Sequence, residues 1–305
     1  MFKFIDLCAG IGGFHLGLSR LGGKCVFACE KDKFAQKTYL NWWGMDPSCD
    51  LTEIEPRNIP QYDVLAAGFP CMSFSCAGKK LGFKDKTRGT IIFNIFSIIE
   101  DTSPKAVILE NVKNLLYHDN KKTITVITNE LKRLGYTVFI DLVNANSWVP
   151  QNRERVFISA IRTDICQNLK LIVRDPLPIE KPKLKDILEK RVDSKYILGD
   201  KTWAWLQKHK EKHKDSGGFG YTLANINSAS RTLTSRYGKD GSEILIAIPK
   251  SNPRKLTPRE CARLMGFPDN LDIVVSNYQA YKQFGNAVVP PCVTWIARPI
   301  MEIIK

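Results

Sequence analysis

The sequence predicts an α/β protein, with a mostly parallel sheet covered by helices and a second, smaller and more basic region after it. Three observations support this. Short β-branched and aromatic runs alternate with amphipathic stretches through the first half of the chain. The composition then changes at the proline- and charge-rich run RDPLPIEKPKLKD (174–186), which is typical of a domain boundary. Finally, residues 171–270 hold 20 Lys and Arg against 12 Asp and Glu, so much of the positive charge lies there.

Six runs in the first region predict strands, and two patterns between them predict helices. The strands are FKFIDL (2–7), KCVFACE (24–30), YDVLAAG (62–68), KAVILEN (105–111), YTVFIDLV (136–143) and VFISAIR (156–162). The helical patterns are Phe14, Leu18 and Leu21, and TIIFNIFSIIEDT (90–102). The first five strands are apolar on both faces, as buried parallel strands are. Ligands of such sheets lie beyond the carboxyl ends of the strands, so we examined the strand ends first.

The remaining chain divides into three parts. Residues 171–257 form the basic region, whose glycines and serines predict loops and short strands rather than long helices. Residues 258–285 are expected to be a hinge, and the helix-like stretch 286–305 is expected to pack back on the first domain, residues 1–170.

Composition narrows the class of protein. A chain of 305 residues with 44% apolar and 25% charged residues is typical of a folded protein, and its net charge of +14 favours nucleic acid as a partner over a merely basic surface. No signal peptide and no apolar run of about 18 residues is present, which predicts a cytoplasmic protein. Nine cysteines without a C-x-x-C pair, and four histidines, favour buried reduced thiols over a disulfide framework or a metal site.

The first strand ends in the glycine-rich turn DLCAGIGGF (6–14). Gly10, Gly12 and Gly13 allow a ligand close to the backbone at a helix start, although a purely structural turn has the same spacing. Glu30 ends the second strand, where a carboxylate can accept both ribose hydroxyls, and Asp50 can accept a hydrogen bond from an adenine amine. The turn lacks the phosphate-binding G-x-x-x-x-G-K-[ST] pattern, so these residues predict a nucleoside site rather than ATP or GTP hydrolysis.

The third strand leads into GFPCMSFS (68–75). Cys71 follows a proline in a small, polar loop, which predicts a reactive nucleophile, whereas a core thiol would have apolar flanks. The following CAGKKLGFKDKTRG (76–89) has glycines and cations typical of a lid over a polyanion.

Two further motifs bring charge to strand ends. Glu110 closes an apolar strand in LENV, where it is suited to proton donation or to a structural hydrogen bond. Arg153 and Arg155 in QNRER are expected on one face, as two forks for an acidic or carbonyl ligand or as a surface salt-bridge pair.

Taken in order, these motifs resemble the bacterial cytosine-5 DNA methyltransferases of type II restriction-modification systems. The match runs through DLCAGIGGF, Glu30, Asp50, GFPCMSFS, ENV, QNRERVF, RKLTPRECARLMGFPD (254–269) and YKQFGNAVV (281–289). The resemblance implies a Rossmann-like domain that binds S-adenosylmethionine, at 1–170 and completed by 286–305, and a target-recognition domain at 171–257. It also implies duplex DNA as partner, no metal and a monomer.

The resemblance assigns the chemistry as follows. Cys71 attacks carbon 6 of a cytosine flipped out of the duplex, carbon 5 takes the methyl group, and loss of its proton expels Cys71. Glu110 protonates or hydrogen-bonds the ring nitrogen. Arg155 holds the base's carbonyl oxygen, and Arg153 supports the closed loop.

The resemblance also implies two sets of binding residues. The cofactor set is Asp6, Cys8, Ala9, Gly10, Gly12, Gly13, Glu30, Lys31, Asp50, Leu51, Pro70, Ile91 and Asn286. The DNA set is Met72, Ser73, Ser75, Lys79, Arg88, Thr232, Leu233 and Arg236. Three residues depart from the family pattern: Cys8 stands where Phe is usual, Lys31 where an aromatic residue is frequent, and Met72 where Gln is usual. We expect the two missing rings to loosen cofactor binding, and Met72 to alter DNA contacts.

Two other interpretations remain open at this point. The tRNA-directed branch of the family shares the cysteine, ENV and the arginine pair, but the recognition region of this chain is long. A catalytically silent DNA-binding protein on the same scaffold would not need the full set of Cys71, Glu110, Arg153 and Arg155.

Overall fold

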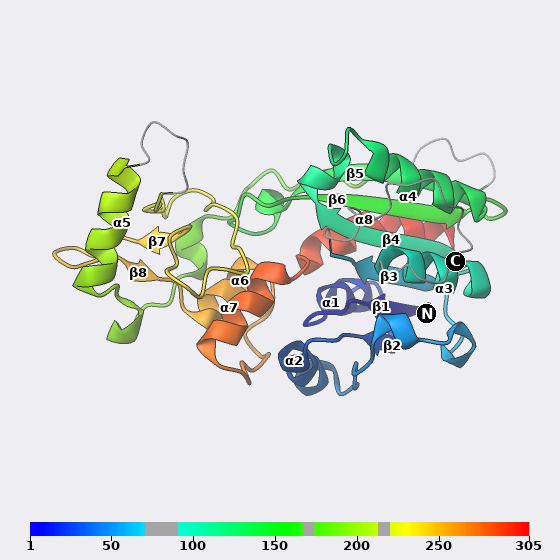
Figure 1. The fold of residues 1–305 in the computed structure, drawn as a ribbon, viewed down its shortest axis with the longest axis horizontal. Helices are drawn as coiled ribbons and strands as arrows, with labels where there is room; N and C mark the ends of the chain where they lie inside the picture. The colour runs from blue at the N-terminus through cyan, green and yellow to red at the C-terminus, as the bar shows by residue number, and fades with distance from the viewer. Residues whose placement is uncertain (71–90, 167–173, 213–219, 305) are drawn as a thin grey trace. The chain divides into compact units, whose positions relative to one another are not determined.

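The computed structural model describes residues 1–70, 91–166, 174–212 and 220–304, and it divides into two compact units (Figure 1). The first unit consists of Met1–Val143, Glu154–Pro176 and Val288–Lys305. The second unit consists of Asn144–Arg153 and Leu177–Ala287. The segment 258–285, for which the sequence predicts a hinge, therefore groups with the second unit.

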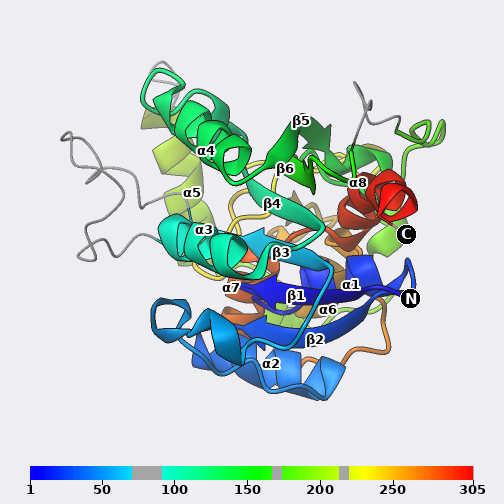
Figure 2. The ribbon, with the colours of Figure 1, turned by 90° about the vertical axis from the view of Figure 1, so that its right-hand side faces the viewer.

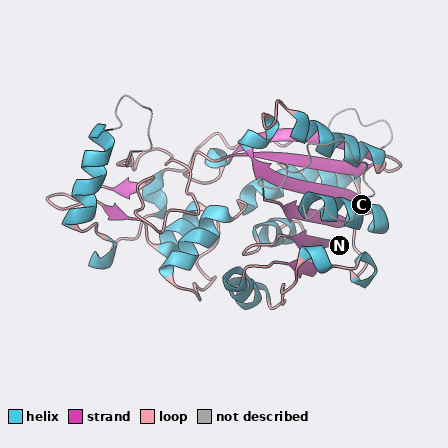
Figure 3. Cartoon of the chain, viewed as in Figure 1, coloured by secondary structure: helices cyan, strands magenta, loops and turns pink. Residues whose placement is uncertain are grey.

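A six-stranded sheet of order β2-β1-β3-β4-β6-β5 forms the centre of the first unit (Figure 3). Its strands are β1 (Lys3–Leu7), β2 (Lys24–Cys29), β3 (Val64–Gly68), β4 (Ala106–Val112), β5 (Tyr136–Asn144) and β6 (Glu154–Arg162). The pairs β1–β2, β1–β3 and β3–β4 are parallel, and β4–β6 is antiparallel. The mostly parallel sheet is confirmed, and the antiparallel pair brings the start of β6 beside the end of β4.

Helices cover both faces of this sheet (Figure 2). They are α1 (Gly13–Ser19), α2 (Lys33–Trp43), α3 (Ile91–Thr102), α4 (Lys122–Arg133) and α8 (Pro290–Ile303). The α3 and α4 helices bury residues such as Ile95 and Ile127 in one core with Leu65 and Leu109 of the sheet. Successive strand residues face opposite sides, so Gly68, Glu110 and Arg155 belong to the other face, on the side of α1 and α8.

The fifth strand differs from the expectation of a strand that is apolar and buried on both faces. Ile140 is 45% exposed and Leu142 is 44% exposed. The reason is position, because β5 is the last strand of the described sheet and pairs on one side only, with β6. Its apolar sequence alone did not distinguish an edge strand from a central one.

The second unit has little regular structure, as its glycines and serines predict. Its elements are α5 (Asp200–Lys212), α6 (Pro258–Leu264), α7 (Asn277–Asn286), β7 (Leu245–Ile246) and β8 (Arg254–Lys255). The short 3-10 helices of the two units are Leu51–Glu53, Pro56–Asn58, Lys113–Leu116, Ala145–Ser147, Leu184–Ile187 and Ser194–Tyr196. The two strands form a small antiparallel ladder. The exception to the prediction is α5, a helix of 13 residues.

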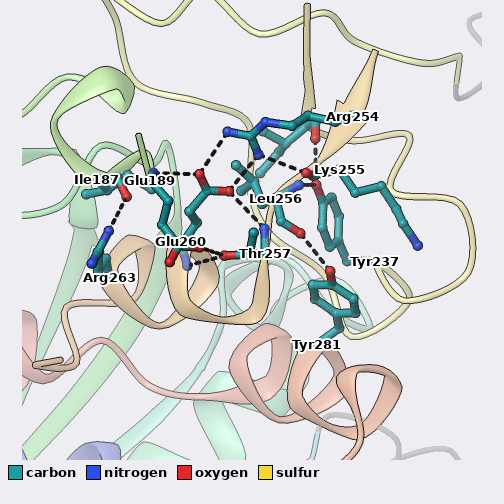
Figure 4. Close-up of polar contacts among 11 residues, drawn as sticks. Ile187, Glu189, Tyr237, Arg254, Lys255, Leu256, Thr257, Glu260, Arg263 and Tyr281 are labelled. Carbon is teal, nitrogen blue, oxygen red and sulfur yellow. Dashed lines mark hydrogen bonds and ion pairs between the residues drawn. The ribbon is translucent and has the colours of Figure 1, made fainter. Parts of the chain in front are cut away.

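A buried polar network fixes the start of α6 (Figure 4). Arg254 donates from both terminal nitrogens to the two carboxylate oxygens of Glu260, each at 2.8 Å. Glu260 also accepts from the backbone N–H of Thr257, whose hydroxyl accepts from the N–H of Glu260, so the two residues form a capping box. A buried charge pair with its remaining lone pairs satisfied is tolerated in a core, and this one orders the motif 254–269.

Within the part of the chain that the structure describes, no helix is long and apolar enough to span a bilayer.

Candidate active site at the carboxyl edge of the sheet

The carboxylate of Glu110 lies at the end of β4, beside the end of β3. Glu110 pairs in register with Gly68, and a methyl group built on Gly68 would lie 3.8 Å from Oε2 of Glu110. Arg155, near the start of β6, places Nε 3.1 Å from Oε1 of Glu110. Both side chains are largely buried, at 10% and 18% exposure. A carboxylate and a guanidinium are therefore held together where β4 ends and β6 begins, a contact that the sequence reasoning did not specify.

Asn111 fixes the chain that leaves β3. Its side-chain amide donates to the backbone carbonyl of Phe69 at 2.7 Å, and its own oxygen accepts from the N–H of Val112. Asn111 is buried, so both bonds are shielded from water. Sequence reasoning treated ENV as a glutamate motif and missed this role of its asparagine, which holds the main chain two residues before Cys71.

Six residues of the predicted site fall outside the described residues. They are Cys71, Met72, Ser73, Ser75, Lys79 and Arg88. The predicted lid at 76–89 falls there too. Their predicted roles remain predictions.

The glycine-rich turn after β1 is joined to Glu30 at the end of β2. The backbone N–H of Gly10 donates to Oε2 of Glu30 at 2.8 Å, and that of Asp32 donates to Oε1 at 2.8 Å. Each carboxylate oxygen retains a lone pair for a further donor. Gly12 has φ +86°, and a methyl group on it would lie 2.2 Å from the indole nitrogen of Trp43. This position therefore requires glycine for both conformation and space.

Asp50 forms a salt bridge with Lys31, a contact that the sequence did not reveal. Nζ of Lys31 lies 2.6 Å from Oδ2 of Asp50, while the Thr52 backbone N–H and hydroxyl both donate to Oδ1. The Lys31 hydrogen bond, with those from Thr52, lowers the pKa of Asp50 to about 2. The side chain of Lys31, which stands where the family pattern often has an aromatic ring, is 80% exposed. Its ammonium group binds the Asp50 carboxylate that is expected to accept from an adenine amine.

Asp6 is fully buried under the glycine turn. Oδ2 accepts from the backbone N–H of His15 at 3.3 Å, and among the described residues no donor reaches Oδ1. Burial raises the pKa of Asp6 well above its usual value. The imidazole of His15 stacks on Trp43 at 4.4 Å between ring centroids and contacts the hydroxyl of Tyr39, and burial lowers its pKa to about 4.

Cys29 and Cys49 form a disulfide. Sequence reasoning favoured reduced thiols, which Cys8, Cys25 and three further described cysteines, Cys166, Cys261 and Cys292, do carry. No C-x-x-C spacing signals this pair, because its two residues are 20 apart and meet only through the fold. The bond ties together the residues that immediately precede Glu30 and Asp50.

The other predicted cofactor residues vary in exposure. Ala9 and Leu51 are buried, Cys8 and Ile91 are half-buried, and Pro70 and Asn286 are exposed. Gly13 lies at the first residue of α1, where a methyl group would meet the Val288 carbonyl oxygen. No group of three or more His, Cys, Asp or Glu side chains in the described ranges is arranged to hold a metal ion.

Arg153 does not form the predicted pair with Arg155. It precedes β6, and its guanidinium donates to three backbone carbonyls, those of Leu233 at 3.0 Å, Gly285 at 3.0 Å and Ala287 at 2.9 Å. Arg153 is 2% exposed, so this contact is internal to the second unit. Simple strand alternation failed here because the strand begins only at Glu154.

The QNRER motif also contacts the segment around Thr232, for which the sequence predicts a role in DNA recognition. Gln151 accepts from the N–H of Leu233 and donates to the Leu264 carbonyl, while the hydroxyl of Thr232 donates to the carbonyl of Asn152 at 2.5 Å. Leu233 is fully buried in the free chain, and its predicted role in DNA binding remains a prediction. Thr232 and Arg236 have solvent access and remain candidates.

Comparison with known proteins agrees with this geometry. The solved structure of a DNMT2 mutant from Spodoptera frugiperda superposes with a TM-score of 0.78 over 100% of this chain and 99% of that one, at 21% identity, which shows a shared α/β fold. The sequence profile of the C-5 cytosine-specific DNA methylases matches residues 2–302. The chain belongs to this family of methyltransferases.

Curated relatives in the family are similar over almost the whole chain. Type II methyltransferase M1.ScrFI of Lactococcus lactis subsp. cremoris is 49% identical over 309 residues, covering 100% of this chain and 79% of the relative. Type II methyltransferase M.DsaV of Dactylococcopsis salina is 45% identical over 306 residues, covering 99% of this chain and 86% of the relative. The resemblance inferred from the motifs is confirmed.

Proposed function

We propose that this chain transfers a methyl group from S-adenosylmethionine to carbon 5 of cytosine in a short duplex DNA site, as the modification enzyme of a restriction-modification system. One observation carries the proposal beyond family membership. The Glu110–Arg155 pair stands next to Gly68, three residues before Cys71, on the edge where parallel sheets bind ligands. The carboxyl group and the guanidinium thus lie where β4 ends and β6 begins, and Cys71 follows the end of the neighbouring strand β3.

Each residue has a distinct role in the proposed reaction. The Cys71 thiolate adds to carbon 6 of the flipped cytosine, and the electron pair displaced toward the ring is stabilised by Glu110, which donates a proton or hydrogen bond to the ring nitrogen. Arg155 orients Glu110 and hydrogen-bonds the carbonyl oxygen of the base. Carbon 5 then takes the methyl group from the sulfonium, which leaves as a neutral thioether. Transfer of the carbon 5 proton to water re-forms the ring double bond and expels Cys71 as thiolate.

The residues around the glycine turn fit an adenosyl group. Both oxygens of Glu30 keep lone pairs for ribose hydroxyls, and no atom of the described residues lies within 4 Å of a methyl group built on Gly10. When bound, S-adenosylmethionine supplies an electrophilic methyl group on a sulfonium. Asp50 is placed to accept from the adenine amine once Lys31 releases it.

The remaining roles follow from the same proposal. Residues 171–257 read the target sequence, 258–285 connect them to the catalytic domain, and 286–305 complete it. The protein acts as a monomer on DNA in the bacterial nucleoid. The free-energy cost of unstacking the cytosine is offset by new contacts to the extruded base.

The first experiment measures transfer of labelled methyl groups from S-adenosylmethionine to duplex DNA and, separately, to tRNA. Transfer to DNA alone is expected. Transfer to tRNA alone would replace the proposal with the tRNA-directed activity, and no transfer to either would indicate a silent binding protein. Bisulfite sequencing of plasmid from expressing cells then identifies the methylated cytosine.

The second experiment tests the nucleophile on duplex DNA that contains 5-fluorocytosine at the methylated position. Fluorine at carbon 5 blocks release, so a covalent protein–DNA adduct is expected with the native chain and with Cys76→Ser. No adduct is expected with Cys71→Ser. An adduct that survives Cys71→Ser would overturn the assigned mechanism.

A further inference from the structure

The α5 helix has one face packed on the second unit and another that is exposed and basic. Leu206 is buried in a small cluster with Leu198 and Leu245, against which Trp203 and Tyr221 pack. Lys210 belongs to the packed side too, because its ammonium lies 4.3 Å from the ring centroid of Tyr221. Packing therefore fixes which side of α5 faces solvent.

The exposed side carries a stripe of three lysines and a tryptophan. Lys201, Trp205, Lys208 and Lys212 are spaced at i, i+4, i+7 and i+11, so at 100° per residue they fall within about 60° of the helix circumference. All four are exposed, and Trp205 is 54% exposed. We call these four residues the α5 stripe.

Neither charge nor packing inside the described chain accounts for the α5 stripe. None of its three lysines forms an ion pair with a described residue, whereas Asp200, at the helix start, accepts from Asn252. The Trp205 ring contacts only the His209 ring among described aromatic groups, at 5.0 Å. Trp205 therefore presents a half-exposed indole between cationic side chains, so this side of the helix offers both charge and apolar area to a ligand.

We infer that the α5 stripe binds the sugar-phosphate backbone of duplex DNA, an inference that rests on the proposed function. Its first and last lysines are eleven positions apart, about 16 Å along the helix, which corresponds to roughly five phosphates of one strand along the duplex axis. Lysine ammonium groups pair with phosphates, and the indole offers an apolar surface to the deoxyribose. Such contacts add affinity that is independent of base sequence.

The test separates charge from apolar contact through salt dependence. Binding of the full chain to a labelled duplex of about 30 base pairs is measured by fluorescence anisotropy between about 50 and 200 mM NaCl. Each phosphate contact contributes about 0.9 to the slope of log affinity against log salt. The triple variant Lys201→Gln/Lys208→Gln/Lys212→Gln is expected to lower that slope by about 2 to 3, and Trp205→Ala to weaken binding several-fold at every salt concentration with the slope unchanged.

Two control variants keep the result interpretable. Lys201→Arg/Lys208→Arg/Lys212→Arg retains the charge and should retain the native slope. Lys24→Gln/Lys37→Gln/Lys132→Gln removes the same charge from exposed lysines of the first unit and should change the slope by less than about 1. A native slope in the α5 triple glutamine variant, with native methyl transfer to DNA, would refute the inference and leave the proposed function intact. Failure of the native chain to bind DNA would refute both.

Discussion

The Nε atom of Arg155 lies 3.1 Å from Oε1 of Glu110, across the antiparallel pair of β6 and β4. This ion pair predicts the effect of removing the carboxylate. Glu110→Gln keeps the shape but loses the acid, and general acid-base groups contribute about 10²- to 10⁴-fold. We expect kcat for methyl transfer to fall by that range while S-adenosylmethionine affinity stays near native. Glu154→Gln, on β6 next to Arg155 and paired with exposed Lys113, is the control and should retain activity.

The salt bridge between Lys31 and Asp50 leads to a second prediction, which concerns cofactor affinity. Lys31→Phe restores a ring and frees Asp50, so calorimetric titration should show S-adenosylmethionine binding about 3- to 10-fold tighter. Lys31→Gln frees Asp50 without adding a ring and should gain less. Equal affinity in all three proteins would show that Lys31 is neutral for binding.

The same pair gives a pH prediction for Asp50. Because the Lys31 and Thr52 hydrogen bonds lower the pKa of Asp50 to about 2, this carboxyl stays ionised as pH falls through its ordinary value of 3.8. Stabilisation from the contact is complete above pH 3.8 and is lost as pH falls through about 2. In Lys31→Gln, carboxyl-detected NMR titration should show the pKa of Asp50 rising toward 3.8.

His15 predicts acid sensitivity of the first unit. Burial lowers the pKa of His15 from 6.5 to about 4, so the folded chain resists protonation of this imidazole. Its contribution to the free energy of unfolding is fully present above pH 6.5 and is lost as pH falls toward 4, at a cost of about 2–3 kcal/mol. Urea unfolding at pH 7 and pH 4.5 should show a smaller pH-dependent loss in His15→Gln than in the native chain, with His209→Gln behaving as native.

Gly12 lies in the glycine-rich turn, and Gly22, outside it, is a matched control. Both have positive φ, +86° and +81°. A methyl group on Gly12 would meet the Trp43 indole, whereas one on Gly22 would have no atom of the described chain within 4 Å. Gly22→Ala should cost only the backbone strain, about 1 kcal/mol. Gly12→Ala should cost at least about 1 kcal/mol more by denaturant unfolding and should weaken S-adenosylmethionine binding. Equal costs would mean that Trp43 moves aside freely.

Much of the site was predictable because its residues end strands of a parallel sheet. Glu30 and Glu110 were located correctly from apolar runs alone, since burial of both faces gives a clear pattern and the carboxyl ends share an edge. What failed depended on long-range geometry. The disulfide of Cys29 and Cys49 joins residues 20 apart, and the Lys31–Asp50 salt bridge joins residues 19 apart, so neither has a local signal.

Arg153 shows a different failure. Strand alternation was applied one residue too early, and the actual partners lie 80 to 134 residues away in sequence. Arg153→Met should leave three buried carbonyls without their donor and destabilise the fold by about 3 kcal/mol or more, measured by denaturant unfolding. Arg155→Met should reduce the free energy of unfolding less but should lower the rate of methyl transfer. The two variants thus distinguish the structural role of Arg153 from the proposed catalytic role of Arg155.

All three acceptors of Arg153 are main-chain oxygens, so the guanidinium does not depend on which side chains those positions carry. Residues near Thr232 can therefore be exchanged during evolution without loosening their attachment, provided Leu233 stays apolar to fill its buried place. Under the proposed function, a new DNA target could then arise by exchange of the outward side chains near Thr232 alone. Arg153 would hold the main chain of that segment in the same place throughout.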